Sequence, residues 1–436
     1  MRTISKKVID TEWRFEDPLQ GERHQHELNM DFDDHIHRVV VTGLGPVTTI
    51  GIGRQQFTEA LQVGKTHIDV SRCLDTTCLE INIVSELSDF DPNTFVRRLD
   101  CEKIGRSSQF GVSGAYLALE DSGLKPEALA KRSCGVCVGT TNGEALSIDA
   151  FADICRLDAS SNRAALAGNR LSADNLSLSI AQEFHLMGEV VTIATACAAG
   201  NYAIGHAYDL IVSGQADIMI CGGADAICRK NLAGFYRLGS LAPEKCQPFD
   251  RDRKGIVVGE GAGILILERL DCALARGAPV YAEILGYGLN CDADHIVSPN
   301  EQSICECFHI AHANAGITPQ EVDYICAHGT GTPLNDVIEV GAVKQVFGQH
   351  PPPMSSIKSM LGHTMGAASA LGGIACSIGI HEGFMPPTMN LENQDPECDI
   401  DCVPNQARSA DIKIAQNNGF AFAGNNAIIV LAKIEA

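Results

Sequence analysis

Positive charge, aromatic side chains and long apolar runs are all scarce in this sequence. Among 436 residues there are 33 lysines and arginines against 54 aspartates and glutamates, a formal net charge of −21, and one tryptophan. Such an acidic excess disfavours a nucleic-acid partner, because the phosphate backbone would be repelled. An acidic protein partner would need a local basic patch on which to dock.

Long hydrophobic segments are also missing. The longest uncharged run, about residues 190–208, is interrupted by Asn201 and His206, and we interpret it as a buried strand and helix rather than a membrane span. Residues 1–36 are polar and charged throughout, without the charged-then-apolar pattern of a signal peptide. We therefore expect a cytoplasmic protein without membrane association.

The 18 cysteines lie mostly singly inside apolar runs, which is typical of free thiols in a reducing compartment. The C-x-x-C motif at 134–137 has no partner pair at zinc spacing. On a helix, Cys305, His309 and His312 would fall at i, i+4 and i+7 and could share one face, whereas Cys307 points elsewhere. Because no fourth ligand completes a tetrahedral site, we favour packing residues and expect no bound metal.

The chain is expected to comprise three parts: a flexible polar extension over residues 1–37, a first half over 38–278 and a second half over 279–436. From residue 38 onward, β-branched runs alternate with helical patterns. A polar region at 144–180 shows no regular pattern. The patterns predict strands at 38–53, 134–143, 189–200 and 216–226, and helices at 55–63, 106–122 and 198–213.

The second half repeats the order of the first. Four pairs of segments correspond: 280–290 with 38–53, 323–332 with 134–143, 357–375 with 193–207, and 414–432 with 216–226. Two similar halves of alternating strands and helices predict a parallel-rich, layered α/β fold with pseudo-twofold symmetry. In such a fold, side chains from matching positions can converge on one cleft.

Cys197 lies in the stretch IATACAAGNYAIGH, where a predicted strand ends and a helix begins. Its small neighbours permit a sharp turn that exposes the sulfur. A helix N-terminus favours the thiolate, which a nucleophilic cysteine needs. The alternative is a cysteine buried in a tightly packed helix, which is the commoner use of the residue.

Two histidines and a lysine stand out in the second half. His328 ends an apolar run and opens HGTGTP, which would place it at the carboxyl edge of a sheet. His363 follows Lys358 by five residues in KSMLGH, and the internal repeat matches it to Cys197. Either histidine alone would more often be structural, but the correspondence between the halves favours a shared site.

These motifs together resemble the β-ketoacyl-[acyl-carrier-protein] synthases, specifically the elongating, two-histidine branch of the thiolase superfamily. The resemblance covers residues 38–434 and implies a thiolase-like, layered αβαβα fold with duplicated halves. The matching motifs, all in family order, are TACAAG (195–200), PFD (248–250), GEGAG (259–263), HGTGTPLND (328–336) and KSMLGH (358–363).

The resemblance implies a decarboxylative Claisen condensation. An acyl group passes from carrier protein to Cys197 as a thioester; malonyl-carrier then loses carbon dioxide, and the resulting enolate attacks that thioester. His328 and His363 would donate N–H groups to the enolate oxygen. Backbone N–H groups of Cys197 and Phe422 would stabilise the second oxyanion.

Other residues receive supporting roles from the same resemblance. Lys358 would maintain the charge balance around the histidines, and Glu339 is the expected supporting carboxylate, paired with Lys358. Thr330 and Thr332 would bind the phosphopantetheine arm, which arrives on the acyl carrier protein, so no bound cofactor is expected. A histidine at position 363, where initiating synthases have asparagine, favours elongation.

The sequence departs from the family pattern at two places. The gating loop, usually Gly-Phe-Gly-Gly, reads AFAG at 421–424, and alanine disfavours positive φ, so the Phe422 gate is expected to be stiffer. Asn142 is polar in the segment that lines the acyl pocket and dimer interface. Both departures suggest a specialised polyketide or polyene pathway rather than housekeeping fatty-acid synthesis.

A basic cluster formed by Arg237, Arg251, Arg253 and Lys254 is the candidate docking site for an acidic carrier protein. We expect a homodimeric elongating ketosynthase of fatty acid or polyketide biosynthesis. The alternative is a ketosynthase-like structural or starter-unit-decarboxylating partner in a synthase complex, with a heterodimer as the corresponding assembly.

Overall fold

The computed structural model describes residues 37–434, apart from residues 78, 130 and 131. The predicted N-terminal extension therefore lies, up to residue 36, outside the described part of the chain. The remaining residues are organised around one mixed sheet of eleven strands.

Five strands of this sheet come from each half of the sequence. The first half supplies β1 (Val39–Thr48), β5 (Cys134–Gly139), β6 (Val190–Ile193), β7 (Ile218–Asp225) and β9 (Gly261–Arg269). The second supplies β10 (Ala282–Cys291), β11 (Tyr324–Cys326), β12 (Met354–Ser355), β15 (Ile414–Phe420) and β16 (Asn425–Ala432). A short strand, β2 (Gly51–Ile52), pairs with β1.

The strand order repeats outward from the centre of the sheet. Strands β1 and β10 pair in the middle; β9, β7, β5 and β6 follow on one side, and β16, β15, β11 and β12 on the other. Each strand thus has an equivalent at the same position in the other half. The predicted duplication and the thiolase-like α/β architecture are confirmed.

The sheet is mixed, and the expectation of a parallel-rich sheet was wrong. All pairings from β7 through β9, β1, β10 and β16 to β15 are antiparallel, whereas the outer pairings on both sides are parallel. The segment 414–432, predicted as one strand, contains two strands, β15 and β16, that form a hairpin. The turn at 421–424 reverses the chain and accounts for the antiparallel pairing.

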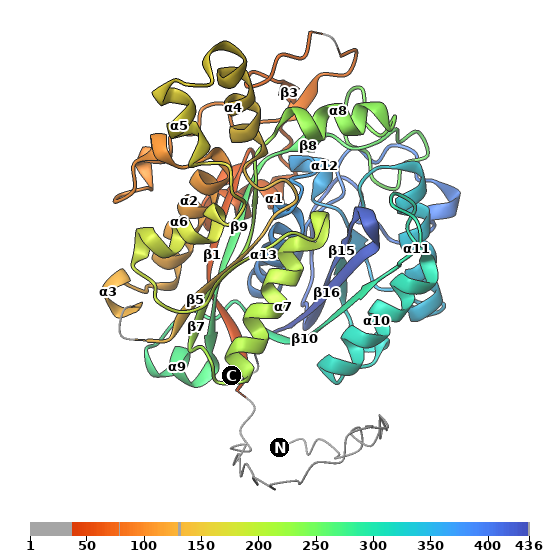
Figure 1. Cartoon of the computed structure of the whole chain (residues 1–436). Helices are drawn as coiled ribbons and strands as arrows, with labels where there is room; N and C mark the ends of the chain where they lie inside the picture. The colour runs from red at the N-terminus through yellow and green to blue at the C-terminus, as the bar shows by residue number, and fades with distance from the viewer. Residues whose placement is uncertain (1–36, 78, 130–131, 435–436) are drawn as a thin grey trace, which may run out of the picture. The chain divides into compact units, whose positions relative to one another are not determined.

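Two helices are packed in the middle of the fold, α7 (Ala199–Val212) and α13 (Ala367–Glu382) (Figure 1). Small residues let them approach closely: a Cβ on Gly200 would lie 2.5 Å from the backbone N of Ala370. Helices α2 (Arg106–Ser122) and α6 (Asn175–Phe184) cover the sheet in the first half. Helices α10 (Glu301–Ala315) and α11 (Pro333–Phe347) lie correspondingly in the second half.

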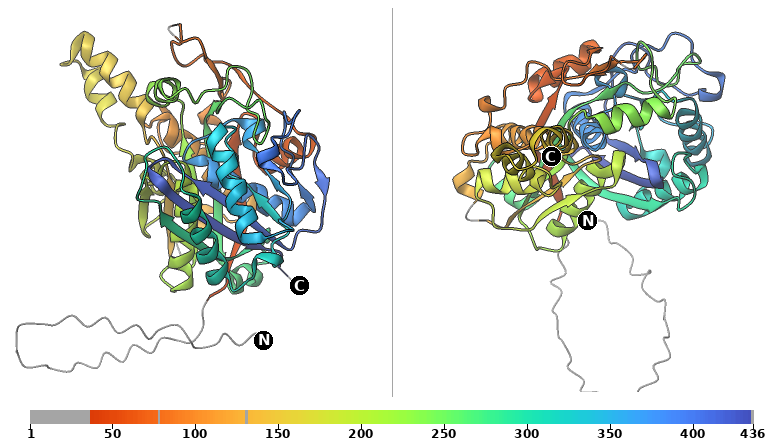
Figure 2. Two further views of the ribbon diagram at one scale, coloured as in Figure 1. Left: turned by 90° about the vertical axis from the view of Figure 1, so that its right-hand side faces the viewer. Right: turned by 45° about the horizontal axis from the view of Figure 1, so that its top comes forward.

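The region 144–180, for which no regular structure was predicted, is largely helical. It contains α4 (Ala145–Asp158), α5 (Asn162–Gly168) and most of α6. Figure 2 shows α4 and α5 projecting away from the sheet. Most of the described side chains of α4 and α5 are exposed or half-buried, so these two helices contribute little to the core.

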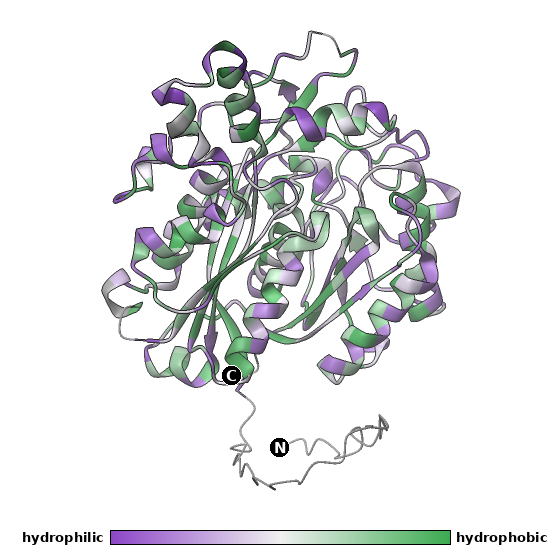
Figure 3. Ribbon diagram, in the orientation of Figure 1, coloured by the Kyte–Doolittle hydropathy of each residue, from purple (hydrophilic) through white to green (hydrophobic). Residues whose placement is uncertain are grey.

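The remaining elements are short or peripheral. The helices are α1 (Arg54–Val63), α3 (Pro126–Leu129), α8 (Arg229–Arg237), α9 (Leu270–Ala275) and α12 (Lys358–Leu361). The strands are β3 (Asp69–Val70), β4 (Ile83–Ser85), β8 (Val258–Gly259), β13 (Phe384–Met385) and β14 (Arg408–Ser409). Hydrophobic residues concentrate in the strands and in α13, with hydrophilic residues on the outer turns of the surrounding helices (Figure 3). We find no helix long and apolar enough to cross a membrane among the described residues.

Candidate active site

A cavity of about 340 Å³ brings together residues from both halves of the chain. Its lining includes Cys197 from the first half and His328, His363 and Phe422 from the second. These four predicted site residues, separated by up to 225 positions, therefore face one space.

Cys197 lies in a 3₁₀ turn, Ala196–Ala198, directly before α7. Ala196 has a φ of 49°, a left-handed conformation that costs alanine energy and turns the chain sharply at the cysteine. The thiol is buried, and burial raises its pKa to about 12, although Lys358 and the backbone N–H groups of Phe422 and Cys197 lower it. Burial therefore opposes the preference for thiolate that is expected at a helix N-terminus.

His363 is held with a defined tautomer. Its Nδ1 accepts a hydrogen bond from the backbone N–H of Met365 at 3.1 Å, so the neutral ring carries its proton on Nε2. Burial, followed by the charge of Lys358, holds its imidazole pKa well below the usual value. The predicted positional match with Cys197 is inexact: Cys197 precedes α7 by two residues, and His363 precedes α13 by four.

His328 directly faces His363. Their ring centroids are 5.6 Å apart and the planes are inclined by 83°. Burial, followed by the nearby charge of Lys358, holds the pKa of His328 well below its ordinary value. The site therefore presents two neutral imidazoles.

Lys358 and Glu339 hold the backbone of His328 rather than pairing with each other. Lys358 Nζ donates to the carbonyl oxygen of His328 at 2.6 Å. Glu339 accepts the N–H groups of His328 at 2.8 Å and Gly329 at 2.7 Å. The predicted direct pairing was wrong: the two charges clamp the peptide that joins His328 to Gly329, one at its C=O and one at its N–H.

Asp336 is a supporting carboxylate whose role the sequence analysis missed. It accepts the backbone N–H groups of Thr330 at 3.1 Å and Gly331 at 3.2 Å, and that of Phe249 at 2.9 Å. It lies one turn before Glu339 on α11, so both carboxylates point at the loop after β11. The signal was present as the last residue of HGTGTPLND.

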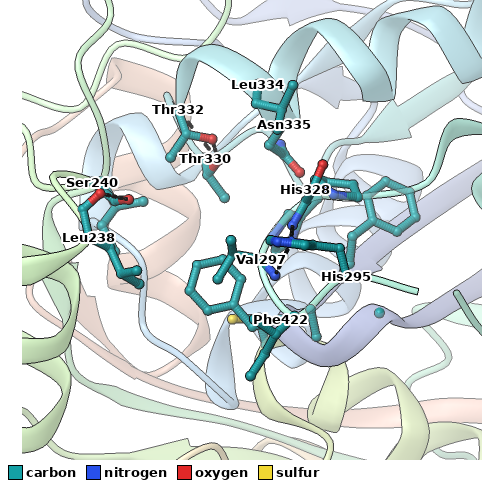
Figure 4. A pocket seen from close by; sticks show the side chains of 18 of the residues that line it. Leu238, Ser240, His295, Val297, His328, Thr330, Thr332, Leu334, Asn335 and Phe422 are labelled. Carbon is teal, nitrogen blue, oxygen red and sulfur yellow. Dashed lines mark hydrogen bonds between the residues drawn. The ribbon is translucent and has the colours of Figure 1, made fainter. Parts of the chain in front are cut away.

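Thr330 and Thr332 lie together on one wall of the cavity, with their hydroxyl oxygens 2.9 Å apart (Figure 4). His295, which the sequence analysis did not select, lies across from them beside His328. Its Nδ1 accepts the backbone N–H groups of Val297 at 3.1 Å and Ser298 at 3.0 Å. This leaves Nε2 of an exposed imidazole as a donor at the rim.

In the loop that carries Phe422, one of the two alanines has a strained backbone conformation. Ala423 has a φ of 66°, in the region that favours glycine, whereas Ala421 is extended with a φ of −130°. The Phe422 ring packs against Phe235 of α8, with centroids 5.5 Å apart. The substitution at 423, and not that at 421, therefore strains the loop.

Two residues, Asn142 and Arg253, lie in surroundings that differ from those predicted. Asn142 does not line the described cavity, and both polar atoms of its side-chain amide are buried without a hydrogen-bond partner. Arg253 is buried and bonded to Asp395 at 2.6 Å, so its assignment to a docking surface was wrong. Arg237, Arg251 and Lys254 are exposed.

The three residues considered as possible metal ligands, Cys305, His309 and His312, have different surroundings. His309 is exposed, whereas Cys305 and His312 are buried. Cys305 and Cys307 donate to the carbonyl oxygens of Ala342 and Gly288, respectively. Within the described residues, no group of three histidine, cysteine or acidic side chains is arranged to hold a metal ion.

Comparisons with known proteins agree with this arrangement. The family model for the β-ketoacyl synthase N-terminal domain matches residues 37–273, and that for the C-terminal domain matches residues 281–392. A 3-oxoacyl-[acyl-carrier-protein] synthase 2 from Synechocystis sp. is 38% identical over 410 residues, covering 91% of this chain and 98% of its own length.

Two solved structures share the fold over nearly the whole chain. The ishigamide ketosynthase/chain length factor has 45% identity and a TM-score of 0.89, covering 92% of this chain and 100% of its own. A type II polyketide ketosynthase in complex with its acyl-carrier protein and bound to the hexaketide has 31% identity and a TM-score of 0.82, with the same coverage.

The chain belongs to the β-ketoacyl synthase family, and the resemblance inferred from its motifs is confirmed. It is accordingly an enzyme of the acyl-transferring ketosynthase class.

Proposed function

We propose that the protein condenses a Cys197-bound acyl group with malonyl-acyl carrier protein, giving 3-oxoacyl-carrier protein and carbon dioxide. The observation that carries this proposal is the pair of neutral imidazoles, His328 and His363, lining the same cavity as a cysteine sulfur. A neutral imidazole can donate its N–H to the enolate oxygen and so stabilise the negative charge that develops there.

In the first step, the Cys197 sulfur attacks the carrier thioester and expels the carrier thiol. Burial keeps Cys197 protonated, so its proton has to leave as the acyl group arrives. Nδ1 of His363 already accepts a hydrogen bond, whereas the ring nitrogens of His328 have none from the described residues. His328 is thus the neighbouring group able to accept that proton and to pass it to the departing carrier sulfur, which returns the imidazole to its neutral form. The N–H groups of Cys197 and Phe422 stabilise the acyl oxyanion.

In the second step, malonyl-carrier loses carbon dioxide, and the enolate that remains attacks the acyl-cysteine carbonyl. The His363 Nε2–H and the His328 imidazole stabilise the enolate oxygen. Lys358 and Glu339 fix the His328 backbone during both steps and keep two compensating charges beside it. Collapse of the tetrahedral intermediate releases the lengthened product on its carrier and the Cys197 thiolate, which takes up a proton from water to restore the buried thiol.

The carrier arm enters past Thr330 and Thr332, whose hydroxyls bind its amide groups. No cofactor resident on the enzyme is required, since phosphopantetheine arrives on the carrier. Three exposed apolar side chains, Leu238, Ile296 and Leu334, surround the cavity mouth. With the exposed basic residues Arg237, Arg251 and Lys254, they form the proposed docking surface for an acidic carrier protein.

We further propose a cytoplasmic homodimer, built from ketosynthase halves 38–278 and 279–436, in a specialised polyketide or polyene pathway. The 45% identity to the ishigamide ketosynthase/chain length factor structure, against 38% to a 3-oxoacyl-[acyl-carrier-protein] synthase 2, supports the specialised pathway. The same structure supports a second candidate, in which this chain acts with a ketosynthase-like partner as a heterodimer.

Intact-mass spectrometry tests the proposal directly. Wild-type protein and Cys197→Ala are incubated with a panel of acyl-carrier thioesters, and malonyl-carrier is then added. We expect an acyl mass gain in wild type alone, and a 3-oxoacyl-carrier product afterwards. A wild type that gains no mass from any donor, alone or with a co-purified ketosynthase-like partner, would contradict the proposed condensation.

A further inference from the structure

Behind the proposed catalytic histidines, a buried hydrogen-bond chain extends from the sheet into α10. His312 Nε2 lies 2.7 Å from Gln416 Oε1, and Gln416 Nε2 donates to Asn418 Oδ1 at 2.7 Å. Asn418 Nδ2 then donates to Glu339 Oε1 at 3.0 Å. Every side chain in this chain is at most 3% exposed.

In this hydrogen-bond chain, the direction from donor to acceptor is fixed, and it can be deduced from the Glu339 end. Glu339 Oε1 accepts from both the His328 N–H and Asn418 Nδ2, so Asn418 presents its NH₂ group to Glu339 and its oxygen to Gln416. Gln416 then presents its NH₂ group to Asn418 and its oxygen to His312. The last partner must be a donor, which requires the proton of neutral His312 to be on Nε2.

The fold places these residues in line. Gln416 and Asn418 are two positions apart on β15, so both side chains project from the same face of the sheet, towards α10 and α11. His312 reaches them from α10, where its ring stacks on Phe308 at 6.4 Å and meets Phe347 edge-on at 5.6 Å. Burial, chiefly, lowers the imidazole pKa of His312 and keeps the ring neutral, as the polarity requires.

We propose that His312 and Gln416 are positioning residues: through Asn418 they orient the Glu339 carboxylate, and through it the backbone that aims the His328 imidazole into the cavity. The inference rests on the proposed function for the role of His328. Without the His312 donor, the Gln416 amide is free to rotate and present its oxygen to Asn418. Asn418 would then turn its NH₂ group away from Glu339, which loses a hydrogen bond.

A packing role for His312 is the competing explanation, because its ring also fills space between two phenylalanines. His312→Phe separates the two roles, since it keeps an aromatic ring there and removes the donor. His309→Phe is the matched control: the same substitution, one turn away on α10, at an exposed side chain. Gln416→Met, which has a similar shape without polar atoms, interrupts the chain at its second member. His312→Gln supplies a side-chain N–H again.

Hydrogen–deuterium exchange of the His328 and Gly329 amides is the primary measurement, because both amides donate to Glu339 and their exchange needs no activity. We expect about tenfold faster exchange in His312→Phe and Gln416→Met, the effect of losing one buried hydrogen bond. We expect wild-type exchange in His309→Phe and partial recovery in His312→Gln. The kcat for condensation should fall by a similar factor in the first two variants, with KM unchanged.

Equal exchange at these amides in His312→Phe, Gln416→Met and His309→Phe would overturn the proposal, as would uniformly faster exchange that extends along α13. If His312→Phe fails to fold, Gln416→Met decides between these outcomes. A wild type that catalyses no condensation would remove the proposed function, while the exchange rates would still decide whether the chain positions the His328 backbone.

Discussion

Strands β7 and β15 occupy equivalent positions in the two halves of the sheet, yet they bury different kinds of side chain. All eight residues of β7 are buried, and the strand is apolar until its last residue, Asp225. In the middle of β15, by contrast, three consecutive amides, those of Gln416, Asn417 and Asn418, are at most 1% exposed. Of these two equivalent strands, the one that buries side-chain amides belongs to the half that holds the histidines.

The difference follows from what each half positions. Cys197 is placed by a strained backbone turn, and Asp225 accepts the N–H groups of Thr141 and Asn142 in the same half and that of Gly366 in the other half. In the second half, the buried side chains of Lys358 and Glu339 hold the backbone of His328. The ring of His363 is oriented by the backbone N–H of Met365.

The largest effect is expected from removing one reactive side chain from each half in turn. Cys197→Ala should lower condensation by at least about 10³-fold, because the covalent intermediate is lost, while malonyl decarboxylation continues at the histidines. His363→Ala should do the reverse, with acylation of Cys197 retained and decarboxylation lowered by about 10²–10³-fold. Carbon dioxide release and intact mass report the two steps separately. Loss of both steps in both variants would contradict this division.

The next effect concerns the charges that clamp the His328–Gly329 peptide. Lys358→Met leaves Glu339 as a buried, uncompensated carboxylate and should lower the free energy of unfolding by about 3–5 kcal/mol. The double variant Lys358→Met/Glu339→Gln should lose less than the two single losses added together. Urea unfolding of all four proteins measures this coupling. Strict additivity would show that the two charges act independently, although they share a peptide.

The pH dependence of stability should sharpen the comparison, because one buried group in each half acts with opposite sign. Burial raises the pKa of Glu144 in the first half to about 7. The folded state then binds the extra proton between pH 4.5 and 7, and stability falls as pH rises through that range. Glu144→Gln should therefore reduce the loss in unfolding free energy between pH 5 and 7.5 by about 2 kcal/mol.

His312 in the second half has a lowered pKa, so wild type should lose stability as pH falls below 6.5, and His312→Phe should reduce that loss. Urea unfolding at several pH values compares both variants with wild type. Unchanged slopes in both would contradict the assigned protonation states.

The smallest effect is expected in the Phe422 loop. Ala423→Gly removes the left-handed strain of alanine and should stabilise the protein by up to about 1 kcal/mol. Ala421→Gly is its control, since residue 421 is extended and glycine there only increases the entropy of the unfolded chain. Thermal unfolding distinguishes the two. Equal destabilisation by both glycines would show that the loop conformation at 423 is not strained.

Much of the fold could be predicted because duplication doubles each signal. The pairing of 38–53 with 280–290 and of 134–143 with 323–332 anticipated the matching of β1 with β10 and of β5 with β11. Strand direction could not be read in the same way, since an apolar run looks alike in parallel and antiparallel sheets. Helices α4 and α5 escaped prediction because little of their surface is buried.

The candidate site was predictable where a residue type is itself chemically distinctive. Cys197, His328, Lys358 and His363 were selected on that basis, and all four lie in or directly against the cavity. Asp336, Asn418 and Gln416 were missed, because amides and carboxylates acquire a role only through the groups they contact. Arg253 was misassigned for the same reason: nothing near it in the sequence reveals that it is buried and bonded to Asp395.

The pairing of β1 with β10 has a mechanical consequence. Val39, Val40 and Val41 pair with Ile284, Glu283 and Ala282, so one continuous hydrogen-bonded sheet joins the two halves. The halves cannot open and close about a hinge without breaking that ladder. The spacing between sulfur and imidazoles is therefore built in when the chain folds, and a growing substrate has to be accommodated by the loops at the rim.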